Sequence, residues 1–243
     1  MVHSPSPYAQ AMLAFWHGDA DATYTINRDD GFSYPVPVGP SFAGPPFTPV
    51  EQFALDRCAG RVLDVGAGVG RHALCLQERG LQVTAVEVAP ELVAIMSARG
   101  VAEPLAENLF SLSGREFDTV LMLMNGFGMV GSPLGADAFF DHARHLLRPG
   151  GQILCDSLDV RQTTNSVHLA YQQANLDAGR SAGQMRFSIE YGGQHGEGFE
   201  WLHVDFDSLH ALARNHRWSA EKLVQEEGGR YLARLIDDDI RMD

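Results

Sequence analysis

Apolar and polar positions along this chain follow two periods, one typical of buried strands and one typical of helices. Short runs of β-branched and aliphatic residues predict strands, which lie at 62–65, 83–87, 101–105, 118–124 and 152–155. Stretches with a helical period predict helices between these strands, as at 72–79 and 91–99, each followed by glycine. Strands that alternate with helices in this order predict a doubly wound α/β fold around a mostly parallel sheet.

The part of the chain after the strand at 152–155 predicts an insertion and then the end of the sheet. A polar stretch comes first, with a short helix near 168–174. Alternating residues at 185–191 and 200–206 then predict a β-hairpin, which we expect to cover the carboxyl ends of the parallel strands. A helix at 208–216 and a terminal antiparallel hairpin complete a predicted sheet of seven strands.

The first 50 residues predict an appendage to this domain. Pro7 begins a short helix that ends near Gly18. The stretch 19–49 contains many prolines and several aromatic residues, and it predicts a loop. Because disordered segments contain few aromatic residues, we expect this loop to be a lid. The predicted organisation is a helix and lid at 1–50 and an α/β domain at 51–243, with the inserted hairpin at about 185–206.

A glycine-rich motif follows the first strand, in the sequence Asp64-Val65-Gly66-Ala67-Gly68-Val69-Gly70. A strand, a glycine turn and a helix N-terminus together favour nucleotide binding, because the unpaired N–H groups of the helix face the ligand. The dinucleotide motif Gly-x-Gly-x-x-Gly would need its third glycine where this chain has Arg71. A carboxylate at Asp64 would also repel a pyrophosphate, whereas it suits a cationic ligand.

With this motif the chain resembles the class I S-adenosylmethionine-dependent methyltransferases. Further motifs of that family are an acidic residue at the end of the second strand, Glu87, and the pair Glu107-Asn108 after the third. The stretches 117–121 and 146–151 are similar to the family's fourth strand and to the turn before its fifth. The resemblance extends from about residue 48 to residue 236, and it implies a Rossmann-like fold with S-adenosyl-L-methionine as cofactor.

The resemblance also implies which residues bind the cofactor: Asp64, Gly66, Gly68, Gly70, Glu87, Val88, Glu107, Asn108 and Asn125. The three glycines would line its methionine part, while Asp64 would support their loop. Glu87 would accept hydrogen bonds from both ribose hydroxyls. Glu107 would accept a hydrogen bond from the adenine amino group, and the backbone N–H of Asn108 would reach a ring nitrogen.

Candidate catalytic residues are Asn125 and Tyr171. Asn125 stands where amino-group methyltransferases begin an Asn/Asp-Pro-Pro-aromatic motif, but Gly126-Phe127-Gly128 follows it here. An amide at this place would orient a donor nitrogen by accepting a hydrogen bond from it, although it equally suits a turn that ends the fourth strand. The residues predicted to meet the substrate come from the lid, and they are Tyr24, Arg28, Phe32 and Tyr34.

Charge and cysteine content limit the class of partner. The formal net charge is −13 and Lys222 is the only lysine, so nucleic acid and anionic membranes would be repelled. Cys58, Cys75 and Cys155 are odd in number and widely spaced, which argues against disulfides or a zinc site. No histidine pair has a convincing metal-ligand spacing. With no signal peptide or apolar run of about 18 residues, we expect a cytoplasmic protein without metal or membrane span.

These patterns predict a transferase of small-molecule metabolism or biosynthesis that uses S-adenosyl-L-methionine. Transfer of the methyl group to an O or N atom of a small molecule is the first interpretation, because an acidic surface and an aromatic lid suit a compact substrate. A second is alkyl transfer or cyclisation with release of 5′-methylthioadenosine, for example with formation of azetidine-2-carboxylate. A third is a nucleotide-binding protein without catalysis. The sequence leaves the oligomeric state open.

Overall fold

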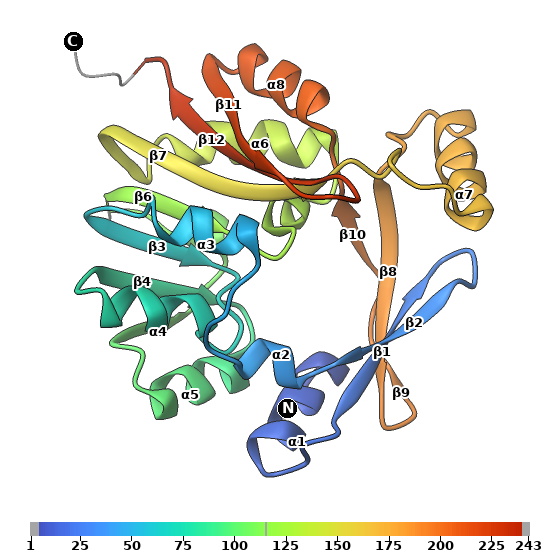
Figure 1. The fold of residues 1–243 in the computed structure, drawn as a ribbon, viewed down its shortest axis with the longest axis horizontal. Helices are drawn as coiled ribbons and strands as arrows, with labels where there is room; N and C mark the ends of the chain where they lie inside the picture. Colours follow the sequence, from blue (N-terminus) through green and yellow to red (C-terminus); the bar gives the residue numbers. More distant parts are fainter. Residues whose placement is uncertain (1–4, 115, 240–243) are drawn as a thin grey trace.

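A computed structural model describes residues 5–114 and 116–239, which form two β-sheets with helices (Figure 1). The larger sheet has seven strands in the described residues, in the order β11-β12-β7-β6-β3-β4-β5. Its strands are β3 (Arg61–Val65), β4 (Gln82–Glu87), β5 (Glu103–Ala106), β6 (Phe117–Met122), β7 (Leu147–Leu158), β11 (Trp218–Gln225) and β12 (Arg230–Asp237). Strands β3 to β7 pair in parallel, and β12 pairs antiparallel with β7 and β11. The predicted doubly wound, mostly parallel sheet is thus confirmed.

Helices cover both faces of the larger sheet. Successive residues of each strand point to opposite faces, so each strand contributes side chains to both layers of helices. Leu63 belongs to a core cluster with residues of α6 and α8, while its neighbour Val62 belongs to a second cluster with residues of α3, α4 and α5. The bounds of these helices are α3 (Pro49–Leu55), α4 (Arg71–Glu78), α5 (Pro90–Arg99), α6 (Pro133–Ala143) and α8 (Phe206–Asn215). The burial of both faces explains why the central strands are apolar at nearly every position.

The smaller sheet joins two segments that are far apart in the sequence. Its strand order is β10-β8-β1-β2, with β9 paired to β8. The strands are β1 (Thr23–Arg28), β2 (Ser33–Pro37), β8 (Gln184–Tyr191), β9 (Gln194–His195) and β10 (Phe199–Leu202). Figure 1 shows this sheet beside the edge of the larger sheet at which β3 and β4 end. The predicted inserted hairpin is present as β8 and β10, although β10 ends earlier than expected.

The prediction that residues 19–49 form a loop was wrong, because residues 23–28 and 33–37 are paired strands. The prolines that suggested a loop, Pro35 and Pro37, lie on β2, which is an edge strand. A proline lacks an N–H to donate, so it is tolerated where no further strand needs that hydrogen bond. The N-terminal segment and the inserted hairpin therefore build one sheet, with Ile26 of β1 opposite Ile189 of β8.

Two arginines of the larger domain fasten the N-terminal segment beside the glycine motif. Helix α1 (Pro7–Trp16) precedes the smaller sheet, and α2 (Gly39–Phe42) follows it. Arg99 donates hydrogen bonds to the carbonyl oxygens of Val69 and Phe42, at 2.6 and 3.0 Å. Arg71 donates to the carbonyl oxygen of Ala43 at 2.8 Å. These contacts fix the chain that leads from the smaller sheet to α3 directly against the first βα turn.

Candidate functional site

The glycine motif forms the turn between β3 and α4, and its backbone conformation requires glycine. Gly66, Gly68 and Gly70 have φ angles of 66°, 56° and 81°, in the left-handed region that favours a residue without Cβ. A Cβ on Gly70 would lie 2.6 Å from Cγ2 of Val101, so no side chain fits there. Without Cβ atoms at these positions, a ligand can approach the backbone of the turn closely.

Asp64 lies buried beneath this turn, with only 2% of its surface exposed. It accepts a hydrogen bond from the backbone N–H of Ala73 in α4, while its Oδ2 atom has no partner among the described residues. Burial raises the pKa of Asp64 to about 6, although nearby His72 lowers it. A buried carboxylate oxygen without a partner is costly unless a cationic group approaches it, so the site fits a ligand with positive charge.

Glu87 connects the end of β4 to the glycine motif. Its carboxylate accepts hydrogen bonds from the backbone N–H groups of Gly68 at 3.2 Å, Val88 at 2.8 Å and Ala89 at 3.2 Å. Burial raises the pKa of Glu87, whereas these three N–H groups lower it. Two carboxylate oxygens offer about four acceptor sites, so the group retains capacity for a ligand hydroxyl. Val88 itself is 65% exposed.

The loop after β5 brings Glu107 and Asn108 to the same edge of the sheet. The backbone N–H of Glu107 donates to the carbonyl oxygen of Glu87 at 3.1 Å, while its side chain is exposed. The Oδ1 atom of Asn108 accepts from the N–H of Phe110 at 2.9 Å and caps the short 3₁₀ helix η1 (Leu109–Ser111). The side chain of Asn108 is thus used inside the loop, which leaves its backbone for contact with a ligand.

A strained turn ends β6 and begins the 3₁₀ helix η2 (Gly126–Val130). Met124 and Asn125 have φ angles of 64° and 60°, a conformation that costs of the order of 1–3 kcal/mol for each non-glycine residue. The Oδ1 atom of Asn125 is buried without a hydrogen-bond partner among the described residues. Strained backbone and an unused polar atom commonly occur where a protein binds or transforms a ligand.

Tyr8 also reaches the glycine motif, although no sequence motif predicts this contact. Its hydroxyl lies 3.8 Å from the position that a Cβ on Gly68 would occupy. Its ring packs edge-to-face on Tyr24 of β1, with 5.4 Å between the ring centroids. Burial raises the pKa of Tyr8, and burial raises that of Tyr24 to about 12. Only the packing of α1 against the smaller sheet brings Tyr8 here, so no local pattern could reveal it.

The smaller sheet presents an aromatic face, named here the aromatic wall: Tyr24, Ile26, Arg28, Tyr34, Phe187, Ile189, Phe199 and Trp201. Strand register places these side chains on one side of the sheet. One end of the wall contacts the larger domain where Trp201 packs on Gly128. At the other end Tyr24 packs on Tyr8 of α1, whose hydroxyl lies near Gly68. A hollow of about 410 Å³ lies along β1, β8 and β10, with Phe187 and Phe199 in its lining.

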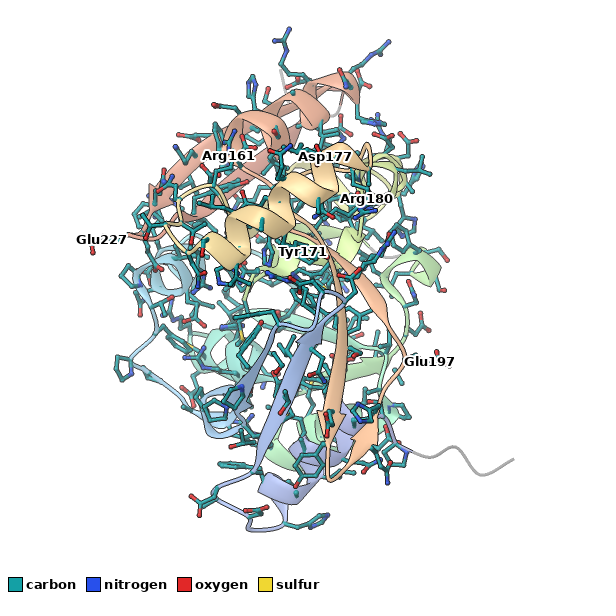
Figure 2. All side chains as sticks on the ribbon, turned by 90° about the vertical axis from the view of Figure 1, so that its right-hand side faces the viewer. Arg161, Tyr171, Asp177, Arg180, Glu197 and Glu227 are labelled. Atoms are coloured by element: carbon teal, nitrogen blue, oxygen red, sulfur yellow. The ribbon has the colours of Figure 1, made fainter. Side chains whose placement is uncertain are left out.

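Arg28 and Tyr171 join the smaller sheet to α7 (Ser166–Asp177), which Figure 2 shows across the end of that sheet. The guanidinium of Arg28 lies 4.1 Å from the ring centroid of Tyr171 and donates to Asp30 at 2.8 and 2.7 Å. The Tyr171 hydroxyl donates to Asp29 at 2.7 Å. Burial, together with Asp29, raises the pKa of Tyr171 to about 12, so its hydroxyl stays protonated and cannot serve as a base near neutral pH.

The candidate residues thus occupy three places. Gly66, Asp64, Glu87 and Asn125 and their neighbours lie where the parallel strands end, while Tyr24 and Tyr34 lie on the aromatic wall. Arg28, Tyr171 and Phe32, whose ring centroid is 4.9 Å from the Arg28 guanidinium, belong to the contact with α7. Among the described residues, no group of three His, Cys, Asp or Glu side chains is placed to hold a metal ion. No helix there is long and apolar enough to cross a bilayer.

Comparison with known sequences gives partial matches in the same region. A family profile described as a methyltransferase domain matches residues 62–151. An uncharacterized methyltransferase of Mycobacterium tuberculosis is 41% identical over 73 residues, which cover 29% of this chain and 30% of that protein. A ubiquinone biosynthesis O-methyltransferase of Xanthomonas oryzae is 32% identical over 113 residues, covering 43% of this chain and 46% of that enzyme. The chain therefore matches less than half the length of these curated relatives.

A solved structure matches over nearly the whole chain. The S-adenosylmethionine-dependent methyltransferase of Bacteroides fragilis, in complex with S-adenosyl-L-homocysteine, is 33% identical, with a TM-score of 0.85. The match covers 98% of this chain and 96% of that one. S-adenosylmethionine carries two cationic centres and a ribose diol, which suit the buried carboxylate of Asp64 and the remaining acceptor capacity of Glu87. The chain belongs to the S-adenosylmethionine-dependent methyltransferases, and S-adenosyl-L-methionine is its cofactor.

Proposed function

We propose that this protein transfers the methyl group of S-adenosylmethionine to an O or N atom of a small molecule. The observation that carries the proposal is the aromatic wall, which contacts the larger domain at Gly128 and, through Tyr8, at Gly68. An acceptor placed between the wall and the glycine turn would be surrounded by ring faces and shielded from water.

The residues of the site have separate tasks in this proposal. When bound, the cofactor supplies an electrophilic methyl group on a sulfonium. Gly66 and Gly68 allow close approach to the backbone, Asp64 offers negative charge, and Glu87 accepts hydrogen bonds from the ribose. Asn125 offers its unpaired oxygen to a donor hydrogen of the acceptor. Most of the rate enhancement then comes from holding acceptor and methyl group in line.

Charge and the matched relatives support a small acceptor. The net charge of −13 repels nucleic acid and other polyanions. The Xanthomonas oryzae relative is named as an O-methyltransferase of ubiquinone biosynthesis, which supports a role in metabolism with an oxygen acceptor as one option. We accordingly propose the predicted division into an N-terminal segment, residues 1–50, and a catalytic domain, residues 51–243, acting together in the cytoplasm on a metabolite.

Cofactor affinity is expected to fall about tenfold between pH 7.5 and pH 5, because of Asp64. The pKa of this buried carboxyl is raised to about 6 in the free protein. Above that pH the group is already ionised and can meet a cationic centre directly. Below it, binding must displace a proton, so the affinity falls about tenfold for each further pH unit. Calorimetry with S-adenosylmethionine in buffers of different ionisation enthalpy measures both the affinity and the proton released.

The Asp64→Asn variant is the matched control, since it keeps the size of the side chain but cannot ionise. Its affinity should be lower at pH 7.5 and should change less with pH than that of the wild type. Glu87 also has a raised pKa, and any pH dependence left in the variant would come from groups of that kind. Equal pH profiles for the two proteins would show that Asp64 does not meet the charge of the cofactor.

One experiment tests the proposed reaction and its alternatives. The pure protein is incubated with S-adenosylmethionine, alone and with a metabolite extract, and the nucleoside product is identified by mass spectrometry. Formation of S-adenosylhomocysteine only when extract is added supports methyl transfer. Release of 5′-methylthioadenosine without an acceptor would instead support cyclisation of the cofactor. Binding without turnover in any extract would leave a nucleotide-binding protein as the function.

A further inference from the structure

Asp156 is a buried carboxylate next to the strained turn after β6. It lies on β7 with none of its surface exposed. Its carboxylate accepts hydrogen bonds from the backbone N–H groups of Asn125 and Gly126, the second at 3.0 Å. Its Oδ2 atom accepts a hydrogen bond from Nε of Arg230 at 2.7 Å and lies 2.6 Å from Nη2. Both oxygens are therefore engaged, one by the turn and one by the arginine.

We propose that Asp156, held by Arg230, is a positioning residue. It fixes the left-handed turn at Met124 and Asn125, and the fixed turn directs the Asn125 carboxamide toward the transferring methyl group. This inference rests on the proposed function, because it assigns a task to a residue of that site. Two successive non-glycine residues with positive φ are unfavourable on their own. The carboxylate offsets this by accepting the two N–H groups that the turn exposes.

Arg230 extends the same contact to the N-cap of α3. It lies on β12, whose Leu232 is opposite Asp156 in the antiparallel register. Its Nη1 atom donates to Oγ1 of Thr48 at 3.3 Å, and Thr48 caps α3. The turn is thus braced by an ion pair that is anchored on a neighbouring strand and on a helix cap. Since Asp156 is shielded from the site by the turn itself, it acts through Asn125 and not on the substrate.

The braced turn offers a ligand one specific feature, the Oδ1 atom of Asn125. This atom is buried and has no hydrogen-bond partner among the described residues. It can accept a hydrogen bond but cannot donate one, so the group that it recognises is an N–H or O–H donor. If it faces the methyl position, the acceptor substrate meets it with the hydrogen of its nucleophilic nitrogen or oxygen.

The test uses two cofactor analogues and no acceptor substrate. S-adenosylhomocysteine lacks the methyl group. In sinefungin a carbon atom replaces the sulfur, and an amine on that carbon replaces the methyl group. The wild type should bind sinefungin at least tenfold more tightly, because its ammonium donates to the Asn125 oxygen. Asn125→Ala and Asp156→Asn should each reduce this preference about tenfold, and the double variant should reduce it no further, since both changes remove the same contact.

Controls separate positioning from a general loss of stability. Asp159→Asn removes a carboxylate that pairs with Arg161 on the same segment, and it should leave the preference unchanged. A purely structural role of Asp156 would weaken both analogues equally, or neither. If Asp156→Asn does not fold, Arg230→Lys keeps the charge but loses the planar contact, and it should lower the preference by a smaller factor.

Two outcomes would overturn the inference. A wild type without preference for sinefungin would show that Asn125 does not face the methyl position. A preference that is lost in Asn125→Ala but kept in folded Asp156→Asn and Arg230→Lys would show that the ion pair does not hold the turn. Both results concern binding alone, so they are distinct from failure of the proposed function, which would appear as absence of S-adenosylhomocysteine formation.

Discussion

Replacing Gly70 with alanine is expected to lower the free energy of unfolding by about 2–4 kcal/mol and to weaken cofactor binding at least tenfold. The residue has a φ of 81°, which any L side chain adopts at a cost. The new Cβ would also lie 2.6 Å from Cγ2 of Val101 and 3.2 Å from Cγ of Met96, so helix α5 and the turn would have to move apart. Urea unfolding and calorimetry with S-adenosylhomocysteine measure the two effects.

Gly80 supplies a matched control for this prediction. Its φ of 85° is close to that of Gly70, but a Cβ on Gly80 would meet nothing within 4 Å. Gly80→Ala should therefore lower the free energy of unfolding by about 1 kcal/mol, the cost of the backbone conformation alone, and should leave cofactor affinity unchanged. Equal destabilisation by the two substitutions would mean that crowding around the glycine turn does not restrict its shape.

Replacing Glu87 with glutamine is expected to weaken cofactor binding by about 1–3 kcal/mol. The carboxylate accepts from Gly68, Val88 and Ala89 and retains one of its about four acceptor sites for a ribose hydroxyl. Glutamine has an NH₂ group in place of one carboxylate oxygen, and this donor faces the N–H and O–H donors that the carboxylate accepts. Calorimetry with S-adenosylhomocysteine should show the loss of affinity, and the melting temperature of the free protein should fall as well, because the amide NH₂ also faces a backbone N–H of the protein.

Glu78→Gln is the control for this substitution, because Glu78 is exposed at the far end of α4 from the glycine turn. It makes the same chemical change and should leave the affinity unaltered. If Glu87→Gln binds S-adenosylhomocysteine as tightly as the wild type, Glu87 serves only to brace the glycine turn. The ribose must then find its acceptors elsewhere.

The larger sheet was predictable because the apolar pattern of its strands agrees with their burial in the folded protein. Val62, Leu63 and Val65 are apolar on both faces, and helices bury both faces, so the pattern and the environment coincide. Asp64 and Glu87 were found by their positions at strand ends, since the carboxyl ends of parallel strands meet at one edge of the sheet. Such residues are identified by order along the chain alone.

The smaller sheet and the support of Asn125 were not predictable in this way. Pro35 and Pro37 look like loop residues until β2 is known to be an edge strand. Tyr8 looks like one more apolar residue of a short helix, and its place above Gly68 depends on how that helix packs. Asp156 belongs to no sequence motif, because its pairing with Arg230 depends on the register between β7 and β12.

The smaller sheet is built from two segments that are far apart in the sequence, and this separation affects the order in which the protein folds during synthesis. During synthesis the β1–β2 hairpin leaves the ribosome long before β8, its partner through Ile26 and Ile189. A two-stranded hairpin alone is marginally stable, so it waits unpaired while the larger sheet assembles. Closing so long a loop is slow, which places completion of the aromatic wall late on the folding pathway. We therefore expect the glycine turn of a newly made molecule to form before the aromatic wall is complete.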